Sequence, residues 1–206
     1  MAWLKQQHRA LRQFYRDEFS ESLLITSAAF LIIWVLSCGV GLINKAIPET
    51  IVAYFSRMLE NSNVLSEDGA INLLALFGNN LRATLVSVLY GFIPFIYLTA
   101  LALGMNALIL GVLAAYYINN GTSLAIHFAG IVPHGIFELP ALLLAFAMGL
   151  MLCKRITQFV QKNAKGMTVP LLKNCARAYL MHVLPLLTVA AVVEVYVTPR
   201  VLDLFM

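Results

Sequence analysis

Charged residues are scarce in this chain: Asp, Glu, Lys and Arg make up 12% of its 206 residues, about half the share found in soluble domains. Hydrophobic residues make up 61%, and the mean hydropathy is +0.83. So little charge leaves no room for a sizeable soluble domain. We therefore expect residues 1–206 to form a single integral membrane domain, and we expect no nucleic-acid partner.

Cysteine is also rare, and the three cysteines are Cys38, Cys153 and Cys175. An odd number without metal-type spacing argues against a disulfide framework and against a cysteine metal site. The sequence also lacks a nucleophilic or redox constellation of the kind that enzymes carry. A short basic leader is missing as well, because acidic residues precede the first apolar run. These absences favour a non-catalytic protein with an uncleaved first helix.

Long apolar runs dominate what is present, and a membrane-spanning helix needs about 20 residues. Five runs are long or apolar enough: residues 23–43, 82–103, 106–118, 135–153 and 179–197. The third run is short and residues 122–132 beside it cannot cross alone, which predicts a short re-entrant or broken helix. Pro94, Pro140 and Pro185 lie inside runs, and each is expected to kink its helix. The expected fold is an all-α polytopic membrane helix bundle with about five transmembrane helices.

Residues 1–20 have the pattern of an amphipathic helix that lies along the membrane surface. The basic residues Lys5, Arg9, Arg12 and Arg16 follow helical spacing and form one narrow stripe. The apolar residues of the opposite side are Trp3, Leu4, Leu11, Phe14, Tyr15 and Phe19. Such a helix places its apolar side in the membrane and its cations near anionic lipid. Membrane lipid is therefore an expected partner, and docking of a protein partner is the alternative.

Basic residues are unevenly distributed between the loops, which predicts the orientation of the chain. The N-terminal segment carries four Lys or Arg and residues 154–178 carry six, whereas residues 44–81 carry two and residues 119–132 carry none. We therefore expect a cytoplasmic N-terminus, a basic cytoplasmic loop at 154–178, an extracytoplasmic loop at 44–81 and a C-terminus outside. Within the outer loop, helical spacing predicts short surface helices near 51–59 and 71–77.

An ionisable pair, His134 and Glu138, opens the fourth apolar run. A charged side chain at the centre of a membrane costs on the order of 2.5–3.5 kcal/mol on insertion scales, so a partner, an ion or a proton must compensate it. On a helix the pair shares one face with Ala141, Ala145 and Gly149. Small residues at this spacing let another helix approach closely. This face is therefore predicted to be buried in the bundle.

Other polar residues are predicted at the same outer depth as this pair. Glu194 ends the fifth run, and His127 belongs to the outer connection. Asn79, Asn80 and Arg82 are placed where the second run opens from outside, while Asn106 opens the third run from the inner side and caps a helix or coordinates an ion.

Three interpretations of this polar cluster remain open. The carboxylates of Glu138 and Glu194 pair with Arg82 or His134 and only fix the packing, or the cluster binds a metal, a proton or a polar substrate, or the residues are merely exposed near the surface. A His and a Glu four residues apart on one helix can share a divalent metal, with His127 or Glu194 as further ligands. No other cofactor is expected.

Several strings carry a resemblance to a known family. They are Asn79-Asn80-Leu81-Arg82, Gly91, Gly104-Met105-Asn106 and Pro133-His134-Gly135 followed by Phe137-Glu138-Leu139-Pro140-Ala141. In these strings the chain resembles the stage II sporulation protein M family, from the first apolar run to the last. The resemblance implies a multi-pass protein of the bacterial or archaeal plasma membrane, and in the sporulation member the membrane component of a peptidoglycan-remodelling complex. Asn106-Ala107 departs from the Asn-Gly that the family often shows.

Three functional hypotheses follow. The first is a non-catalytic membrane scaffold or permease-like subunit of an envelope complex, whose partner is an envelope or cytoplasmic protein or a second copy of the chain. The second is a transporter or channel for a small polar solute or ion. The third is a metal-dependent intramembrane enzyme that uses His134 and Glu138.

Overall fold

The computed structural model describes residues 2–60, 71–162 and 169–205, and almost all of them are helical. The helices are α1 (Ala2–Phe14), α2 (Ser20–Ile43), α3 (Ala46–Glu60), α4 (Leu73–Leu89), α5 (Leu98–Asn119), α6 (Leu124–Lys162), α7 (Val169–Ala178), α8 (Leu184–Tyr196) and α9 (Thr198–Asp203). Short π-helical turns at Tyr15–Phe19 and Tyr179–Val183 join α1 to α2 and α7 to α8, and a 3-10 turn at Tyr90–Phe92 extends α4. The second π-helical turn ends two residues before Pro185, which was expected to kink its helix.

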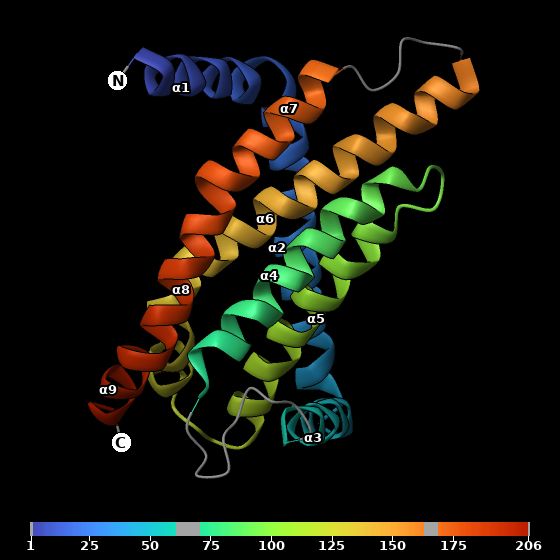
Figure 1. Ribbon diagram of the computed structural model, residues 1–206. Coiled ribbons are helices and arrows are strands. Elements are labelled where there is room, and N and C mark those ends of the chain that lie inside the picture. The colour runs from blue at the N-terminus through green and yellow to red at the C-terminus, as the bar shows by residue number, and fades with distance from the viewer. Residues whose placement is uncertain (1, 61–70, 163–168, 206) are drawn as a thin grey trace.

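Within the described residues, five helical segments are long and apolar enough to cross a membrane: Lys5–Ile43, Leu73–Phe92, Leu98–Asn119, Leu124–Gln161 and Val169–Tyr196. Their number confirms the predicted all-α polytopic bundle. In Figure 1, α1 lies across one end of the bundle, whereas α3 and the C-terminus lie at the other end. An odd number of crossings accounts for this separation of the two chain ends.

The bounds of the second and third spans differ from the prediction. The predicted run 82–103 is not one helix, because the chain turns at residues 93–97 between α4 and α5. Phe95 and Tyr97 adopt positive φ angles of 68° and 50° in this turn. The turn is held to α6 by a hydrogen bond in which the Phe95 backbone N–H donates to Thr157 Oγ1 at 3.0 Å. Pro94 therefore lies in a helix-ending turn and not in a kinked span.

The outer segment 44–81 is partly surface helix and partly membrane span. The helix predicted near 51–59 is confirmed as α3, but the one predicted near 71–77 is wrong, since those residues begin α4. The Asn72 side chain caps α4 by accepting hydrogen bonds from the backbone N–H groups of Leu74 and Ala75, each at 3.1 Å. As a result Asn79, Asn80 and Arg82 lie inside the second span and not at its opening.

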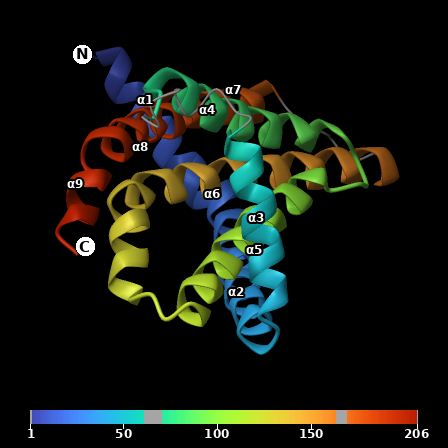
Figure 2. The same ribbon diagram turned by 90° about the horizontal axis from the view of Figure 1, so that it is seen from below.

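Helix α6 runs for 39 residues and contains Pro133 and Pro140. Residues 122–132, predicted to form a broken or re-entrant element, largely form its first turns. Figure 2 shows this N-terminal part turned sharply from the rest of the helix. Pro133 follows these turns in the sequence, and the ring of a proline bends a helix by its clash with the preceding turn. Residues 154–162 and 169–178 of the predicted basic loop are helical as well.

The small-residue face of α6 is buried, as the sequence predicts. Ala141 and Ala145 are fully buried, and a Cβ atom added to Gly149 would lie 2.3 Å from the Ser87 carbonyl oxygen of α4. The hydroxyl of Thr99 on α5 donates to that same carbonyl at 2.8 Å. Helices α4 and α6 therefore pack at backbone contact around Gly149, and the side chain of Thr99 on α5 lies against the same glycine.

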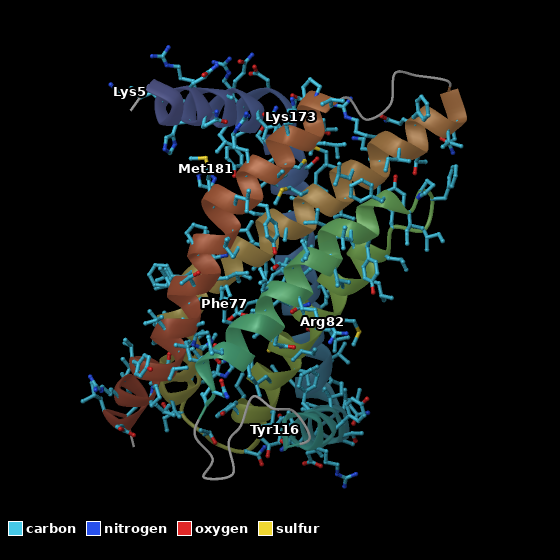
Figure 3. All side chains as sticks on the ribbon, in the orientation of Figure 1. Lys5, Phe77, Arg82, Tyr116, Lys173 and Met181 are labelled. Atoms are coloured by element: carbon cyan, nitrogen blue, oxygen red, sulfur yellow. The ribbon has the colours of Figure 1, made fainter. Side chains whose placement is uncertain are left out.

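Helix α1 packs on the protein with the side that was predicted to enter lipid. Leu11, Phe14 and Phe19 are buried in one cluster with Leu171 and Cys175 of α7; the side chains of Trp3 and Leu4 lie outside the described residues. Lys5, Arg9, Arg12 and Arg16 are all exposed, and Figure 3 shows Lys5 at the far end of the molecule. The insertion of Leu11, Phe14 and Phe19 into lipid was thus a wrong expectation, because α7 offers these side chains an apolar surface.

Candidate functional site

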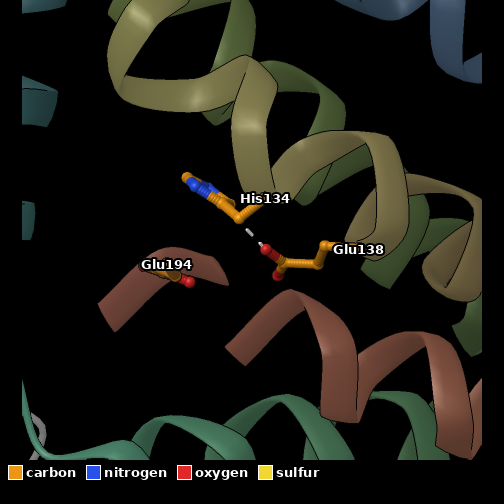
Figure 4. Close-up of side chains that lie close together, drawn as sticks. All are labelled: His134, Glu138 and Glu194. Carbon is orange, nitrogen blue, oxygen red and sulfur yellow. Dashed lines mark ion pairs between the residues drawn. The ribbon is translucent and has the colours of Figure 1, made fainter. Parts of the chain in front are cut away.

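The site lies where the bend of α6 meets the end of α8. His134 and Glu138 stand one turn apart on α6, and Glu194 comes two residues before α8 ends at Tyr196. Figure 4 shows the three side chains directed into one space between these helices. The structure thus brings together residues that lie 60 positions apart in the sequence, toward the end of the bundle that holds the C-terminus (Figure 1).

The three side chains are close enough to act as one group, which we call the His–Glu–Glu cluster (His134, Glu138 and Glu194). One ligand atom from each residue lies within 4.8 Å of the others. His134 Nε2 and Glu138 Oε2 are 4.0 Å apart, and these two side chains are 14% and 22% exposed. Partial burial in apolar surroundings strengthens every charge interaction in the cluster.

A hydrogen-bond chain orients the imidazole of His134. Its Nδ1 lies 3.2 Å from Thr198 Oγ1, and the Thr198 hydroxyl donates to the Val193 carbonyl at 3.3 Å. Because that hydroxyl hydrogen points at Val193, we assign the proton to His134 Nδ1 as the donor to Thr198. The Nε2 lone pair then faces the carboxylates. A backing partner of this kind is typical of histidines that bind metals.

Thr198 is a site residue that was not predicted from the sequence. It is the first residue of α9 and is 8% exposed. The signal that could have located it is Thr198-Pro199, since proline favours the first turn of a helix and thus predicts a new helix after the fifth apolar run.

A cavity of about 450 Å³ adjoins the cluster, between α3, α5 and α6. His134 and Glu138 form part of its wall together with Asn106, and most of the remaining wall is aliphatic. Asn106 lies inside α5, where its Nδ2 donates to the Ala102 carbonyl at 2.8 Å. It therefore does not cap a helix start, and its side chain reaches the same cavity as the cluster.

Three of the predicted polar residues do not reach the cluster. Asn79 and Arg82 are exposed on α4, and the backbone carbonyl of Asn80 accepts a hydrogen bond from Thr84 Oγ1 at 3.0 Å. In the described part of the chain no ion pair joins Arg82 to Glu138 or Glu194. The sequence suggested that Glu138 and Glu194 pair with Arg82 or His134. Of these contacts, the structure contains the one between His134 and Glu138.

His127 lies apart from the cluster, near the start of α6. Its side chain is buried, with 4% of the residue exposed, and its ring packs on Tyr117 at a centroid distance of 5.0 Å. Its Nδ1 has no hydrogen-bond partner among the described residues. The ring lines a neighbouring, largely apolar cavity of about 350 Å³. His127 therefore does not belong to the His–Glu–Glu cluster.

The fold and the site together define a class: a polytopic membrane helix bundle with a His–Glu–Glu cluster between its longest helix and its last span. The model of the stage II sporulation protein M family matches residues 22–199. The chain therefore belongs to this family, as its sequence strings indicated. It is also 30% identical to an uncharacterized protein of Methanocaldococcus jannaschii over 131 residues, which cover 63% of this chain and 72% of the archaeal protein. No solved structure matches the chain.

Proposed function

We propose that this protein is a non-catalytic, permease-like subunit of a plasma-membrane complex, and that its His–Glu–Glu cluster binds a divalent cation. The observation that carries the proposal is the convergence of three ligand-capable atoms within 4.8 Å. Family membership supports a membrane protein of this family and does not distinguish a scaffold from a transporter. The cluster is therefore the basis for the more specific statement.

The charge of the cluster favours a divalent ion. With His134 neutral, two ionised carboxylates leave a net charge of −2 in partly apolar surroundings. Two like charges within 4.8 Å of each other repel by at least roughly 3.5 kcal/mol at an effective dielectric constant of about 20. A divalent cation removes this repulsion and neutralises the group. One imidazole nitrogen and two carboxylate oxygens form a ligand set that suits Zn²⁺ or Mn²⁺.

The geometry of the cluster must contract by up to about 1.5 Å to hold an ion. Ligand atoms at about 2.0–2.2 Å from a tetrahedral Zn²⁺ are about 3.3–3.6 Å apart, whereas the ligand atoms of the cluster lie within 4.8 Å of one another. The flexible side chains of Glu138 and Glu194 can supply the difference by rotation. Thr198 keeps the Nε2 lone pair of His134 directed at the ion through its contact with Nδ1.

The rest of the interior favours a subunit over a complete transporter. Transport needs polar groups across the whole membrane thickness. Along α6, beyond the cluster, Ala147, Met148, Met151 and Leu152 are all at most 3% exposed and belong to one apolar core. The polar residues of the cluster are therefore followed along α6 by buried apolar side chains. A polar site closed on one side in this way suits binding or regulation.

We further propose that the N-terminus is cytoplasmic and the C-terminus lies outside, in a bacterial or archaeal plasma membrane. The exposed basic residues of α1 and the basic end of α6 lie at the same end of the bundle (Figure 1), and such residues favour the cytoplasmic side. The cluster then lies toward the outer face. An ion could reach it from outside without crossing the apolar core.

Metal binding by the purified protein tests the cation site. The protein in detergent is stripped with a chelator, dialysed and titrated with Zn²⁺ and then Mn²⁺, with calorimetry and elemental analysis as readouts. We expect one ion per chain, and a loss of at least about tenfold in affinity in Glu138→Gln and in Glu194→Gln. Glu49→Gln is the matched control, because Glu49 is an exposed carboxylate on α3.

The same titration can refute the cation site. If the wild-type protein retains no more ion than Glu138→Gln, the cluster serves packing alone. Co-purification from native membranes then tests the subunit role separately, since a stoichiometric second protein is expected whether or not an ion is bound.

A further inference from the structure

Arg82 occupies an unusual place for an arginine in a membrane protein. It lies nine residues after the start of the second span at Leu73 and ten before its end at Phe92. At 1.5 Å per residue, it is about 14 Å from either end of the helix. Its side chain is nevertheless exposed on the outside of the bundle, and Figure 3 shows it about halfway along α4.

No described group of the chain compensates this charge. Arg82 takes part in no ion pair and in no hydrogen bond among the described residues. An arginine in mid-membrane costs on the order of 2.5–3.5 kcal/mol, and such residues nearly always face the bundle interior and a polar partner. No described residue supplies such a partner to Arg82, which points to a group outside the chain.

The surroundings of Arg82 suit a closely packed helix. Asn79 is exposed about one turn away, and Gly78 and Ala83 are exposed beside these two polar residues. A Cβ atom added to Gly78 would meet nothing within 4 Å. Small residues on an outer helix face let a neighbouring backbone approach, and the amide of Asn79 adds a second hydrogen-bonding group. We call this surface the Arg82 face (Gly78, Asn79, Arg82 and Ala83).

We propose that the Arg82 face binds a transmembrane helix of a different membrane protein, and that this helix carries an Asp or Glu near mid-membrane. A carboxylate is the complementary group because the planar guanidinium donates two parallel hydrogen bonds to it. The inference rests on the proposed role as a subunit and is independent of the cation site.

A second copy of the chain does not fit this surface. In a twofold dimer the same face would bring two Arg82 guanidinium groups together, with like-charge repulsion. Of the spans Leu73–Phe92, Leu98–Asn119, Leu124–Gln161 and Val169–Tyr196, only the last two carry a carboxylate, and both carboxylates belong to the His–Glu–Glu cluster. The chain therefore offers no free mid-membrane carboxylate of its own in these four spans.

Site-specific photo-cross-linking in native membranes tests this interface. The photoreactive residue p-benzoylphenylalanine is placed at Leu85, which is 46% exposed one turn beyond Arg82, and at Leu101 on α5 as a control, which is 65% exposed. We expect Leu85 to give one protein adduct whose cross-linked peptide is a membrane span with an Asp or Glu. We expect no such adduct from Leu101.

Charge variants test whether the Arg82 guanidinium is required for the adduct at Leu85. Arg82→Glu and Arg82→Gln are each expected to lower the adduct yield at least about tenfold, whereas Arg82→Lys keeps most of it. Replacement of the partner's carboxylate by Lys should restore the adduct in Arg82→Glu. Adducts with a second copy or with lipid alone, or a yield unchanged in Arg82→Glu, would overturn the proposal. Metal binding is measured on the same Arg82 variants and should not change. A loss of the adduct without a loss of metal binding thus separates this interface from the cation site.

Discussion

Replacement of Gly149 by alanine should force α4 away from α6. The added Cβ would lie 2.3 Å from the Ser87 carbonyl oxygen and 2.6 Å from Thr99 Oγ1. Backbone atoms cannot give way as a side chain does, so the helices must separate by about 1 Å to reach ordinary contact. The hydrogen bond from Thr99 to Ser87, 2.8 Å long, would be strained by the same movement.

The expected cost follows from these contacts. Overpacking of a tight interior costs about 1–3 kcal/mol, and loss of one buried hydrogen bond adds about 1 kcal/mol. Against this, alanine favours a helix over glycine by about 1 kcal/mol. The net loss of about 1–3 kcal/mol corresponds to a decrease in Tm of roughly 2–12 °C for a chain of this size.

Thermal unfolding in one detergent, with Gly39→Ala as the matched control, measures this effect. Gly39 also lies inside a helix, but a Cβ atom there would meet nothing within 4 Å. Gly39→Ala should leave Tm unchanged or raise it slightly through helix propensity. Equal Tm values for the two variants would show that α4 and α6 are not in backbone contact at Gly149.

Further predictions concern the site and the N-terminal helix. Thr198→Val should weaken divalent metal binding about 10- to 100-fold while Thr198→Ser retains it, because only the hydroxyl orients His134; titration calorimetry measures both, and equal affinities would exclude an orienting role. Phe14→Ala should destabilise the protein by about 3–5 kcal/mol in thermal unfolding, since Phe14 is 1% exposed, and a Tm unchanged from wild type would contradict the docking of α1 on α7. Arg12→Gln should leave Tm unchanged but weaken binding of a soluble peptide of residues 1–20 to vesicles with anionic lipid by about 1 kcal/mol; equal binding to neutral vesicles would argue against lipid as the partner of the basic stripe.

The number of spans could be predicted from the sequence because apolar length is a property of composition. The turn at residues 93–97 could not, since the residues around Pro94 are as apolar as the helices beside them. Its positive φ angles at Phe95 and Tyr97 are stabilised by contacts to Thr157 and Cys153 of α6. Such long-range contacts leave no mark in a local pattern, and the bounds of the second and third spans were therefore misplaced.

The sequence could predict the depth of the cluster residues in the membrane, but it could not predict that their side chains lie close together. Orientation and helical spacing placed Glu138 and Glu194 at the same outer level, which is all that one-dimensional arguments provide. Their approach depends on the bend of α6 and on the end of α8, and both depend on packing. The same limit applies to Arg82, whose predicted position at a helix opening depended on where the second span begins. With the Asn72 cap, α4 begins nine residues earlier than the predicted run.

The two polar features inside the membrane have opposite signs and opposite surroundings. The His–Glu–Glu cluster is enclosed between α6 and α8, so a small ion is sufficient to neutralise it. Arg82 faces outward in mid-span, where no small counter-ion is retained in hydrocarbon and only another protein can hold a carboxylate at that depth. A chain that compensated both charges with its own residues would need neither an ion nor a partner helix. Among the described residues neither charge has an internal counter-charge, and this is the reason to propose an ion between α6 and α8 and a partner helix at the Arg82 face.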